Sequence, residues 1–345
     1  MNKYVIYSTM AKGDSNAGSK AGRDATDIAV KQGYKFIKLY ESKGTHTTIG
    51  NVIAGYLNIL KLCVQLKEDD IVFLQYPVNR QLMKQMYRML HKKKVHIVTL
   101  IHDIDFLRNV PLGNKGVDGM RKLELSILSQ SEFLICHNPS MIEALKKHGL
   151  NSNYISLELF DYLYKGAEAM KTGDGAVIVA GNLLEQKAGY IYNLKDESFK
   201  LSLYGSNLGD NFIYKNAEYH GSFPPDELIE NMIGDYGLVW DGPEVDTCSG
   251  NYGQYLKINN PHKVSLYMAA GIPVIVWKES ALYPFVEKNG IGFGVESLKE
   301  IDRKLKQYNY IELVEGTRII QKQVREGHYL KSALSAVEKK LENER

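Results

Sequence analysis

Two cationic residues lie where a helix is expected to begin. The stretch Asn259–Trp277 predicts a helix followed by a buried strand, and His262 and Lys263 fall in the first turn of that helix. Asn260 is a favourable N-cap residue, and Pro261 suits the first helical position because no amide hydrogen is needed there. The amides at a helix start carry positive partial charge, so cations there are unfavourable unless an anion binds nearby. We therefore expect a phosphate site at this position; a capped helix with a solvated lysine is the alternative.

Three polar residues follow the predicted strand at residues 95–101. His102, Asp103 and Asp105 come directly after it. Side chains just beyond the carboxyl end of a strand line the ligand site of an open α/β sheet, and these residue types suit acid–base chemistry. We expect one of the aspartates to take up a proton and the histidine to orient it; capping of the next segment is the alternative.

A glycine-rich stretch separates a predicted strand at residues 4–9 from a predicted helix at residues 20–32. This layout is that of a phosphate cradle, but the glycine spacing fits neither the dinucleotide-binding nor the Walker pattern. Ser19, Lys20 and Arg23 at the helix start could bind an anion or an acceptor hydroxyl group. A flexible loop with a solvated first helical turn would explain the same residues.

Further candidates lie near the ends of strands predicted in the second half. Lys187 follows a strand at residues 176–180 and could share a diphosphate with Lys263, in place of a divalent cation. Tyr204 closes a strand at residues 201–204, and its ring could stack on a nucleobase or pack in the core. Short polar side chains suit sugar hydroxyl groups, although turn formation would also explain them. These residues are Asp241, Asp246, Thr247 and Ser249.

Length and composition indicate a globular protein of about two domains. The 345 residues are 44% hydrophobic and 24% charged, and a net charge of +3 gives no electrostatic reason to expect nucleic-acid binding. No apolar run approaches the roughly 18 residues of a membrane span, and the N-terminus lacks a signal pattern. Three widely spaced cysteines predict free thiols in a reducing compartment, so we expect a cytoplasmic protein.

A basic segment ends the helix predicted at residues 81–91. Its cations are Lys84, Arg88, Lys92, Lys93 and Lys94. They could simply satisfy the negative end of the helix dipole, or they could meet anionic lipid headgroups at the inner face of the membrane. Peripheral membrane contact is therefore one possible interaction of the chain.

Predicted strands and helices alternate along the chain, which indicates Rossmann-like α/β folding. The pattern lapses near residues 160–175, where Thr-Gly-Asp-Gly predicts a turn. We expect an N-terminal Rossmann-like domain at residues 1–165 for a second substrate and a nucleotide-binding Rossmann-like domain at residues 166–315. The helices expected at residues 316–345 should pack back on the first domain.

Several strings resemble bacterial glycosyltransferases of the galactofuranosyltransferase and glucosyltransferase 3 type. In order, from about residue 15 to residue 277, they are NAGSKAGRDATDIA, LIHDIDFLR, CHNPSMIEAL, LFDYL, VAGNL, and GLVWDG with DTCSGNYGQYLKINNPHKVSLYM. The resemblance implies a GT-B fold, with two facing Rossmann-like domains, a cleft between them and a UDP-sugar bound mainly by the second. It implies transfer of galactofuranose or glucose to a saccharide acceptor, in the synthesis of surface polysaccharide or glycoprotein. We expect this transfer to need neither a metal ion nor another cofactor.

The resemblance also assigns residues. Those it gives to UDP are Asn182, Leu183, Lys187, Tyr204, Asn260, His262 and Lys263. It implies that the loop at Ser19 and Lys20 closes over the donor. The sequence departs from the family pattern at Leu184 and Glu185, where a small or basic residue is expected, so Lys187 need not be the only group serving the phosphates.

Other functions remain as alternatives. Asp103 and Asp105 form a DxD triplet, as in metal-dependent transferases of another fold. A nucleotide-sugar epimerase or hydrolase, or a non-catalytic nucleotide-sugar-binding subunit, would fit the same two-domain frame. The acceptor could be lipid-linked or on a glycoprotein, and the chain could form a homo-oligomer. If the sugar is galactofuranose, the resemblance suggests inversion, with Asp103 or Asp105 as the base.

Overall fold

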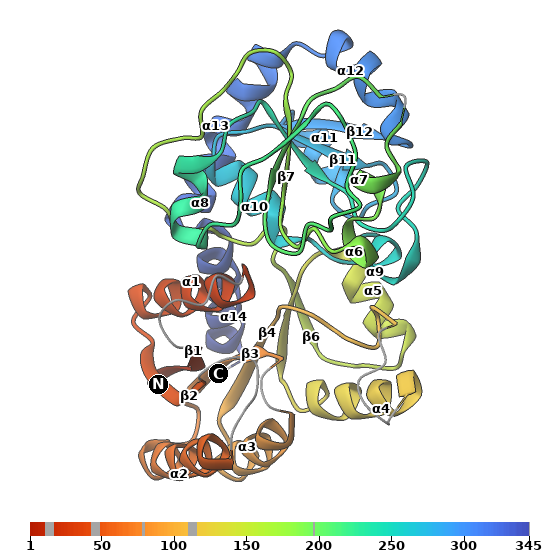
Figure 1. Cartoon of the computed structure of the whole chain (residues 1–345). Coiled ribbons are helices and arrows are strands. Elements are labelled where there is room, and N and C mark those ends of the chain that lie inside the picture. The colour runs from red at the N-terminus through yellow and green to blue at the C-terminus, as the bar shows by residue number, and fades with distance from the viewer. Residues whose placement is uncertain (11–16, 43–48, 78–79, 110–115, 196, 345) are drawn as a thin grey trace. The chain divides into compact units, whose positions relative to one another are not determined.

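The computed structural model describes residues 1–10, 17–42, 49–77, 80–109, 116–195 and 197–344. The chain forms two compact units: the first holds Met1–Leu157 and Tyr329–Arg345, and the second holds Glu158–His328. Each unit is built on one six-stranded parallel sheet with helices packed on it (Figure 1). Within the described ranges, no helix is both long enough and apolar enough to cross a bilayer.

The first unit has the strand order β2-β1-β3-β4-β5-β6. Its strands are β1 Lys3–Met10, β2 Lys35–Ser42, β3 Ile71–Tyr76, β4 His96–Ile101, β5 Phe133–Cys136 and β6 Asn153–Ser156. Its helices are α1 Ala17–Lys31, α2 Ile49–Gln65, α3 Arg80–Lys92, α4 Gly116–Leu128, α5 Pro139–Lys147 and α14 His328–Asn343. Strands covered on both faces read as continuous apolar runs, and β3 is buried along its whole length. Because all six strands run parallel, their carboxyl ends share one edge of the sheet.

Helix α14 joins the first unit from the far end of the chain. Glu338 lies 3.0 Å from the Lys3 ammonium and accepts a hydrogen bond of 2.9 Å from the Tyr34 hydroxyl. The Gln32 amide donates to the Lys331 carbonyl at 3.0 Å. The interior of this unit thus needs residues from both ends of the sequence.

The second unit has the strand order β12-β11-β10-β7-β8-β9. Its strands are β7 Val177–Ala180, β8 Leu201–Tyr204, β9 Ala217–Tyr219, β10 Tyr236–Val239, β11 Val274–Trp277 and β12 Gly292–Val295. Its helices are α6 Glu185–Ala188, α7 Tyr190–Asn193, α8 Pro225–Asn231, α9 Gly250–Tyr255, α10 His262–Ala269, α11 Tyr283–Asn289, the 3-10 helix η2 Leu298–Glu300, α12 Ile301–Gln307 and α13 Tyr310–Glu326. Counted within the unit, this is the doubly wound order 3-2-1-4-5-6, in which the winding reverses between β7 and β10. We call that place the switch point.

The structure confirms the parallel α/β folding of both halves and corrects some boundaries. Asn138 caps α5 as its position suggests, accepting a hydrogen bond of 2.9 Å from the Met141 amide. Helix α10 begins at His262 with Pro261 at the N-cap position, so the expectation that Asn260 caps this helix is wrong. Strands β6 and β12 are present although the sequence pattern did not predict them.

Candidate functional site

Helix α10 is fixed over the switch point by a tyrosine. Strands β7 and β10 pair at only two positions, and beyond them the Tyr267 hydroxyl bridges the gap. It accepts a hydrogen bond from the Ala180 amide at 2.9 Å and donates to the Ile178 carbonyl at 3.1 Å. A Cβ atom on Gly237 would lie 2.2 Å from the Tyr267 ring, so glycine is what lets the ring reach the sheet. The first turn of α10 therefore stands where an open α/β sheet binds its ligand.

Lys263 and Asp241 form a mostly buried ion pair at this place. The Lys263 ammonium lies 2.8 Å from Asp241 Oδ1 and donates to the Trp240 carbonyl at 3.2 Å. The two side chains are only 15% and 10% exposed. An ammonium has three donors, and the third finds no acceptor among the described residues. The pair can thus offer one N–H to an anion.

Two buried hydroxyl groups near Asp241 are also without partners in the described part of the chain: those of Tyr190 and Ser249. The Tyr190 amide donates to the Gly242 carbonyl at 3.1 Å, which places Tyr190 beside the residue after Asp241. Burial, and then the charge of Asp241, raise the pKa of the Tyr190 hydroxyl. A Cβ atom on Gly242 would lie 2.2 Å from the Ser249 carbonyl oxygen, so the Ser249 backbone packs directly on the residue after Asp241. Because buried polar groups are normally hydrogen-bonded, unpaired hydroxyl groups here favour a polar ligand or ordered water.

Glycine turns form the exits of β7 and β8. Gly181 and Gly205 have φ values of 142° and 143°, and a Cβ atom on Gly205 would lie 1.6 Å from the Gly181 carbonyl oxygen. The exposed Asn182 follows, and its Oδ1 accepts a hydrogen bond of 3.1 Å from the Leu184 amide. The Leu183 side chain is fully buried, its amide donates to the Ser206 carbonyl and its carbonyl accepts from the Tyr192 hydroxyl, both at 2.9 Å, so this residue holds the turn in place. Among the described residues, Gly181 has no atom other than those of its chain neighbours within 4 Å of the place where a Cβ atom would lie, so a ligand can approach its backbone closely.

Lys187 lies beside the same loop. Its carbonyl accepts a hydrogen bond of 2.7 Å from the Gly242 amide, which ties α6 to the residue after Asp241. The residue is partly buried, and its ammonium lies 5.7 Å from the centre of the Tyr252 ring. The structure therefore brings Asn182, Lys187, Asp241 and Lys263 to one edge of the second sheet.

Tyr204 does not offer its ring to this edge. The ring is fully buried and stacks on His220 at a centroid distance of 4.8 Å and an angle of 9°. Its hydroxyl accepts a hydrogen bond of 2.9 Å from the Ile233 amide. The structure thus favours the core alternative over base stacking.

Asp246 and Thr247 are also placed differently from the expectation of a sugar contact. Asp246 lies 3.0 Å from the Lys299 ammonium and accepts a hydrogen bond of 3.0 Å from Ser297. That pair is exposed and joins Asp246 to the start of η2 and not to Lys263. Thr247 is partly buried. Of the four polar residues, Asp241 and Ser249 come together.

Asn260 and His262 serve the packing of the segment before α10. The Asn260 amide donates to the Glu158 carbonyl at 2.6 Å. The His262 ring packs against Phe160 and Tyr162, at centroid distances of 5.9 and 5.4 Å. Of the two cations expected at this helix start, Lys263 is the one placed at Asp241.

In the first unit, one arginine holds both predicted aspartates. Arg108 Nη1 lies 3.0 Å from Asp103 Oδ2, and its Nη2 lies 3.3 Å from Asp105 Oδ1. The buried Glu124 carboxylate accepts hydrogen bonds from the Asp105 and Phe106 amides, at 3.3 and 2.9 Å. A cation binding to the DxD triplet would meet carboxylates whose charge the guanidinium already partly neutralises. Sequence reasoning missed Arg108, although its spacing of three residues from Asp105 was a usable signal.

His102 belongs to a buried polar network. The Gln75 amide nitrogen donates to Thr26 Oγ1 at 2.9 Å and to the Gly22 carbonyl at 3.2 Å, so its Oε1 must accept. His102 Nε2 lies 2.8 Å from that oxygen and therefore carries the proton. Burial lowers the pKa of His102 to about 4. Burial, with a further effect of His102, lowers the pKa of the neighbouring His137 to about 3. His102 is thus a neutral, fixed side chain near neutral pH.

The expected loop at Ser19 and Lys20 is helical. Both residues lie in α1 and are buried. The Lys20 ammonium lies 3.0 Å from Asp24 Oδ1, so its charge is already paired with a carboxylate. Arg23 lies one turn after Lys20 and is partly buried. The preceding glycine-rich residues 11–16 lie outside the described residues.

The chain matches two sequence families over nearly its whole length. Residues 3–159 match the N-terminal domain, and residues 177–337 the C-terminal domain, of Glucosyltransferase 3-like proteins. A β-1,6-galactofuranosyltransferase, WbbI, from Escherichia coli K12 is 34% identical over 335 residues, covering 93% of this chain and 94% of the relative. Glucosyltransferase 3 of Streptococcus parasanguinis is 24% identical over 340 residues, covering 96% and 97%.

This chain belongs to the glucosyltransferase 3-like family. It is a glycosyltransferase, as its sequence strings indicated. Among solved structures, a sucrose-phosphate synthase from Thermosynechococcus elongatus has a TM-score of 0.65 and 10% identity, covering 99% of this chain and 100% of that one. Together with the two parallel sheets, this confirms the GT-B fold class.

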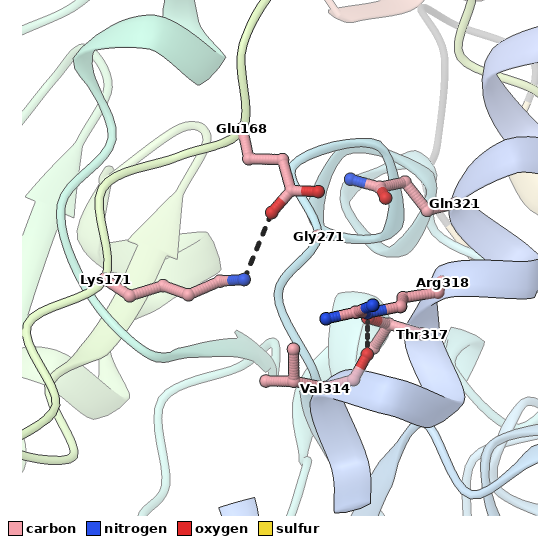
Figure 2. A pocket seen from close by; sticks show the side chains of 7 residues that line it. All are labelled: Glu168, Lys171, Gly271, Val314, Thr317, Arg318 and Gln321. Carbon is pink, nitrogen blue, oxygen red and sulfur yellow. Dashed lines mark hydrogen bonds and ion pairs between the residues drawn. The ribbon is translucent and has the colours of Figure 1, made fainter. Parts of the chain in front are cut away.

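A separate pocket of about 420 Å³ lies in the second unit of this glycosyltransferase (Figure 2). Glu168 and Lys171 pair across it at 3.1 Å, and α13 contributes Arg318 and Gln321. Gly271 places it at the C-terminal end of α10, where β11 begins. That is the opposite end of α10 from Lys263, and none of the predicted site residues lines the pocket. We therefore do not assign the sugar donor to it.

Proposed function

We propose that this glycosyltransferase moves a hexose, galactofuranose or glucose, from a UDP-sugar to a saccharide acceptor without a metal ion. The observation that carries the proposal is the Lys263–Asp241 pair beneath the first turn of α10. It lies at the switch point of a doubly wound sheet, where such folds bind nucleotides. The relatives named as a galactofuranosyltransferase and a glucosyltransferase support the two candidate sugars.

In this proposal the second unit binds the donor. As the bond between sugar and diphosphate breaks, negative charge grows on the phosphate, and Lys263 with the start of α10 stabilises it more in the transition state than before it. Asp241 and Ser249 lie where they could bind sugar hydroxyl groups. Asn182 would approach the nucleotide at the glycine turns, and Lys187 would add a second cation.

The first unit would supply the acceptor side and the base. Asp103 is the better candidate, because its side chain is 40% exposed whereas that of Asp105 is 8% exposed. His102, held by Gln75, would orient it rather than take the proton itself. Inversion at the sugar needs one such base and no covalent intermediate.

Metal independence is supported by Arg108, which already neutralises both members of the DxD triplet. The proposal places the reaction in the cytoplasm, in the synthesis of a surface polysaccharide or glycoprotein. The acceptor would be a saccharide, either lipid-linked or on a protein. A metal-dependent reaction is the second candidate, and turnover in a chelator separates the two.

Thermal melting with UDP, UDP-glucose, UDP-galactofuranose and ADP tests the donor. A ligand that binds the native state raises the melting temperature, so we expect a rise with the uridine compounds and not with ADP. The measurement should be repeated with EDTA, where the rise should persist. Equal shifts with ADP and UDP, or none with any nucleotide, would overturn the proposed donor site. Loss of the shift in EDTA would overturn metal independence alone.

A further inference from the structure

Helix α2 has an apolar stripe on its exposed face. Six residues of this stripe are between 40% and 83% exposed. They are Ile49, Ile53, Tyr56, Leu57, Leu60 and Val64. At about 100° per residue they fall within an arc of about 100° on the helix. This is the width of stripe that a helix normally turns toward a protein core.

The same helix already packs on the first unit with another face. That face holds Gly55, Ile59, Leu62 and Cys63, which are buried. The exposed stripe is therefore a second apolar face. Single exposed apolar residues are normal, but a continuous stripe marks an interaction site.

Helix α3 packs beside α2 (Figure 1). It exposes a basic stripe. Lys84, Arg88, His91 and Lys92 are exposed at the spacing i, i+4, i+7 and i+8. Neither α2 nor α3 contains an aspartate or glutamate. Glu68, in the segment that links α2 to β3, is paired with Lys94 at 2.9 Å. The exposed stripes of this helix pair are therefore apolar on α2 and cationic on α3.

We propose that α2 and α3 form a docking surface for an anionic lipid bilayer. Apolar side chains beside lysine and arginine suit the boundary between headgroups and acyl chains, and Tyr56 is amphipathic as residues at that boundary often are. A second copy of the chain fits less well, because pairing through α2 would bring two basic stripes together without a carboxylate on either helix. The inference rests on the first unit alone and is independent of which sugar is transferred.

Flotation with lipid vesicles tests this surface. The full-length protein is mixed with vesicles of phosphatidylethanolamine and phosphatidylglycerol, or of phosphatidylcholine alone. We expect binding to the anionic vesicles, weakened by salt. The double variant Lys84→Glu/Arg88→Glu should bind about 30-fold more weakly, since each cation near an anionic surface contributes about fivefold or more. The double variant Ile53→Ser/Leu57→Ser should lose at least about tenfold.

Matched variants control for general effects of charge and apolarity. Lys306→Glu/Lys322→Glu and Ile311→Ser/Ile319→Ser change exposed residues of the second unit and should leave vesicle binding unchanged. Melting temperatures identify any variant that fails to fold, and single substitutions then replace the double ones.

Three results would overturn the proposal. The first is equal binding to both kinds of vesicle, and the second is equal loss in the control variants. The third is a wild-type dimer that becomes monomeric with Ile53→Ser/Leu57→Ser and does not bind vesicles, since a second copy would then cover the stripe.

Discussion

Replacement of Lys263 by alanine is the most direct test of the donor site. The substitution removes an ammonium that lies 2.8 Å from Asp241 Oδ1 and 3.2 Å from the Trp240 carbonyl. In the proposed reaction it also removes the N–H that would meet the departing diphosphate.

The expected loss follows from the strength of a charged hydrogen bond. Such a bond contributes about 1.5–3 kcal/mol, which corresponds to roughly a 10- to 150-fold loss of kcat/KM. Stability should fall as well, because Asp241 is left mostly buried without its counter-ion. Breaking a buried pair costs about 3–5 kcal/mol, and the partial exposure of both side chains makes this an upper bound.

The assay is steady-state release of UDP with a saccharide acceptor, at a temperature where melting curves show the variant to be folded. Lys299→Ala is the matched control, because it also removes a lysine paired with an aspartate, 3.0 Å from Asp246, in an exposed pair of the same unit. We expect Lys299→Ala to keep wild-type kcat/KM. Near wild-type turnover by folded Lys263→Ala, or equal losses in both variants, would refute the role assigned to Lys263.

Three other substitutions test the packing around the two sites. Tyr267→Phe leaves the buried Ala180 amide without its acceptor, so urea titration should show a loss of about 1–3 kcal/mol in unfolding free energy; an unchanged midpoint would contradict the bridging role. Gly205→Ala places a methyl group 1.6 Å from the Gly181 carbonyl oxygen, so calorimetry should show a lower melting temperature and weaker stabilisation by UDP, and a fully wild-type response would be evidence against donor binding at these turns. For His102, burial lowers the folded-state pKa to about 4 from about 6.5 in an unfolded chain, so the unfolded state binds the proton first. Its contribution to stability is complete above about pH 6.5 and is lost as the pH falls toward about 4; His102→Gln should flatten this part of the pH–stability curve, and an unchanged slope would show that His102 does not cause it.

The central strands were predictable from sequence because they are buried on both faces and so read as continuous apolar runs. Strand β3 is an example. The Asn138 cap of α5 was predictable for another reason, because asparagine directly before a proline that opens a helix is a local signal. Strands β6 and β12 escaped prediction because both are sheet-edge strands with weak local signals. β6 is partly exposed, and β12 carries two glycines. A Cβ atom on Gly294 would lie 2.5 Å from the Tyr283 ring, so packing against α11 sets the residue type there, not strand propensity.

The candidate site was predictable only where local signals mark it. Lys263 stands out because a cation in the first turn of a helix is unfavourable without an anion. Its partner Asp241 is 22 residues away in sequence, and only the strand order brings the two together. Tyr204 shows the opposite case, because a tyrosine at a strand end fits both a ligand platform and a core, and stacking on His220 is a tertiary contact. Arg108 was not predicted, although it follows Asp105 by three residues and pairs with both aspartates of the acidic triplet.

The contribution of α14 to the first unit has a consequence for biosynthesis. The buried face of this helix includes Leu330, Leu334 and Val337, and Glu338 bonds to Lys3 and Tyr34. A ribosome must therefore translate the whole second unit before the first can close its interior. Fragments cut near residue 157 should be recovered in folded form only when residues 329–345 are supplied, either fused or as a separate peptide.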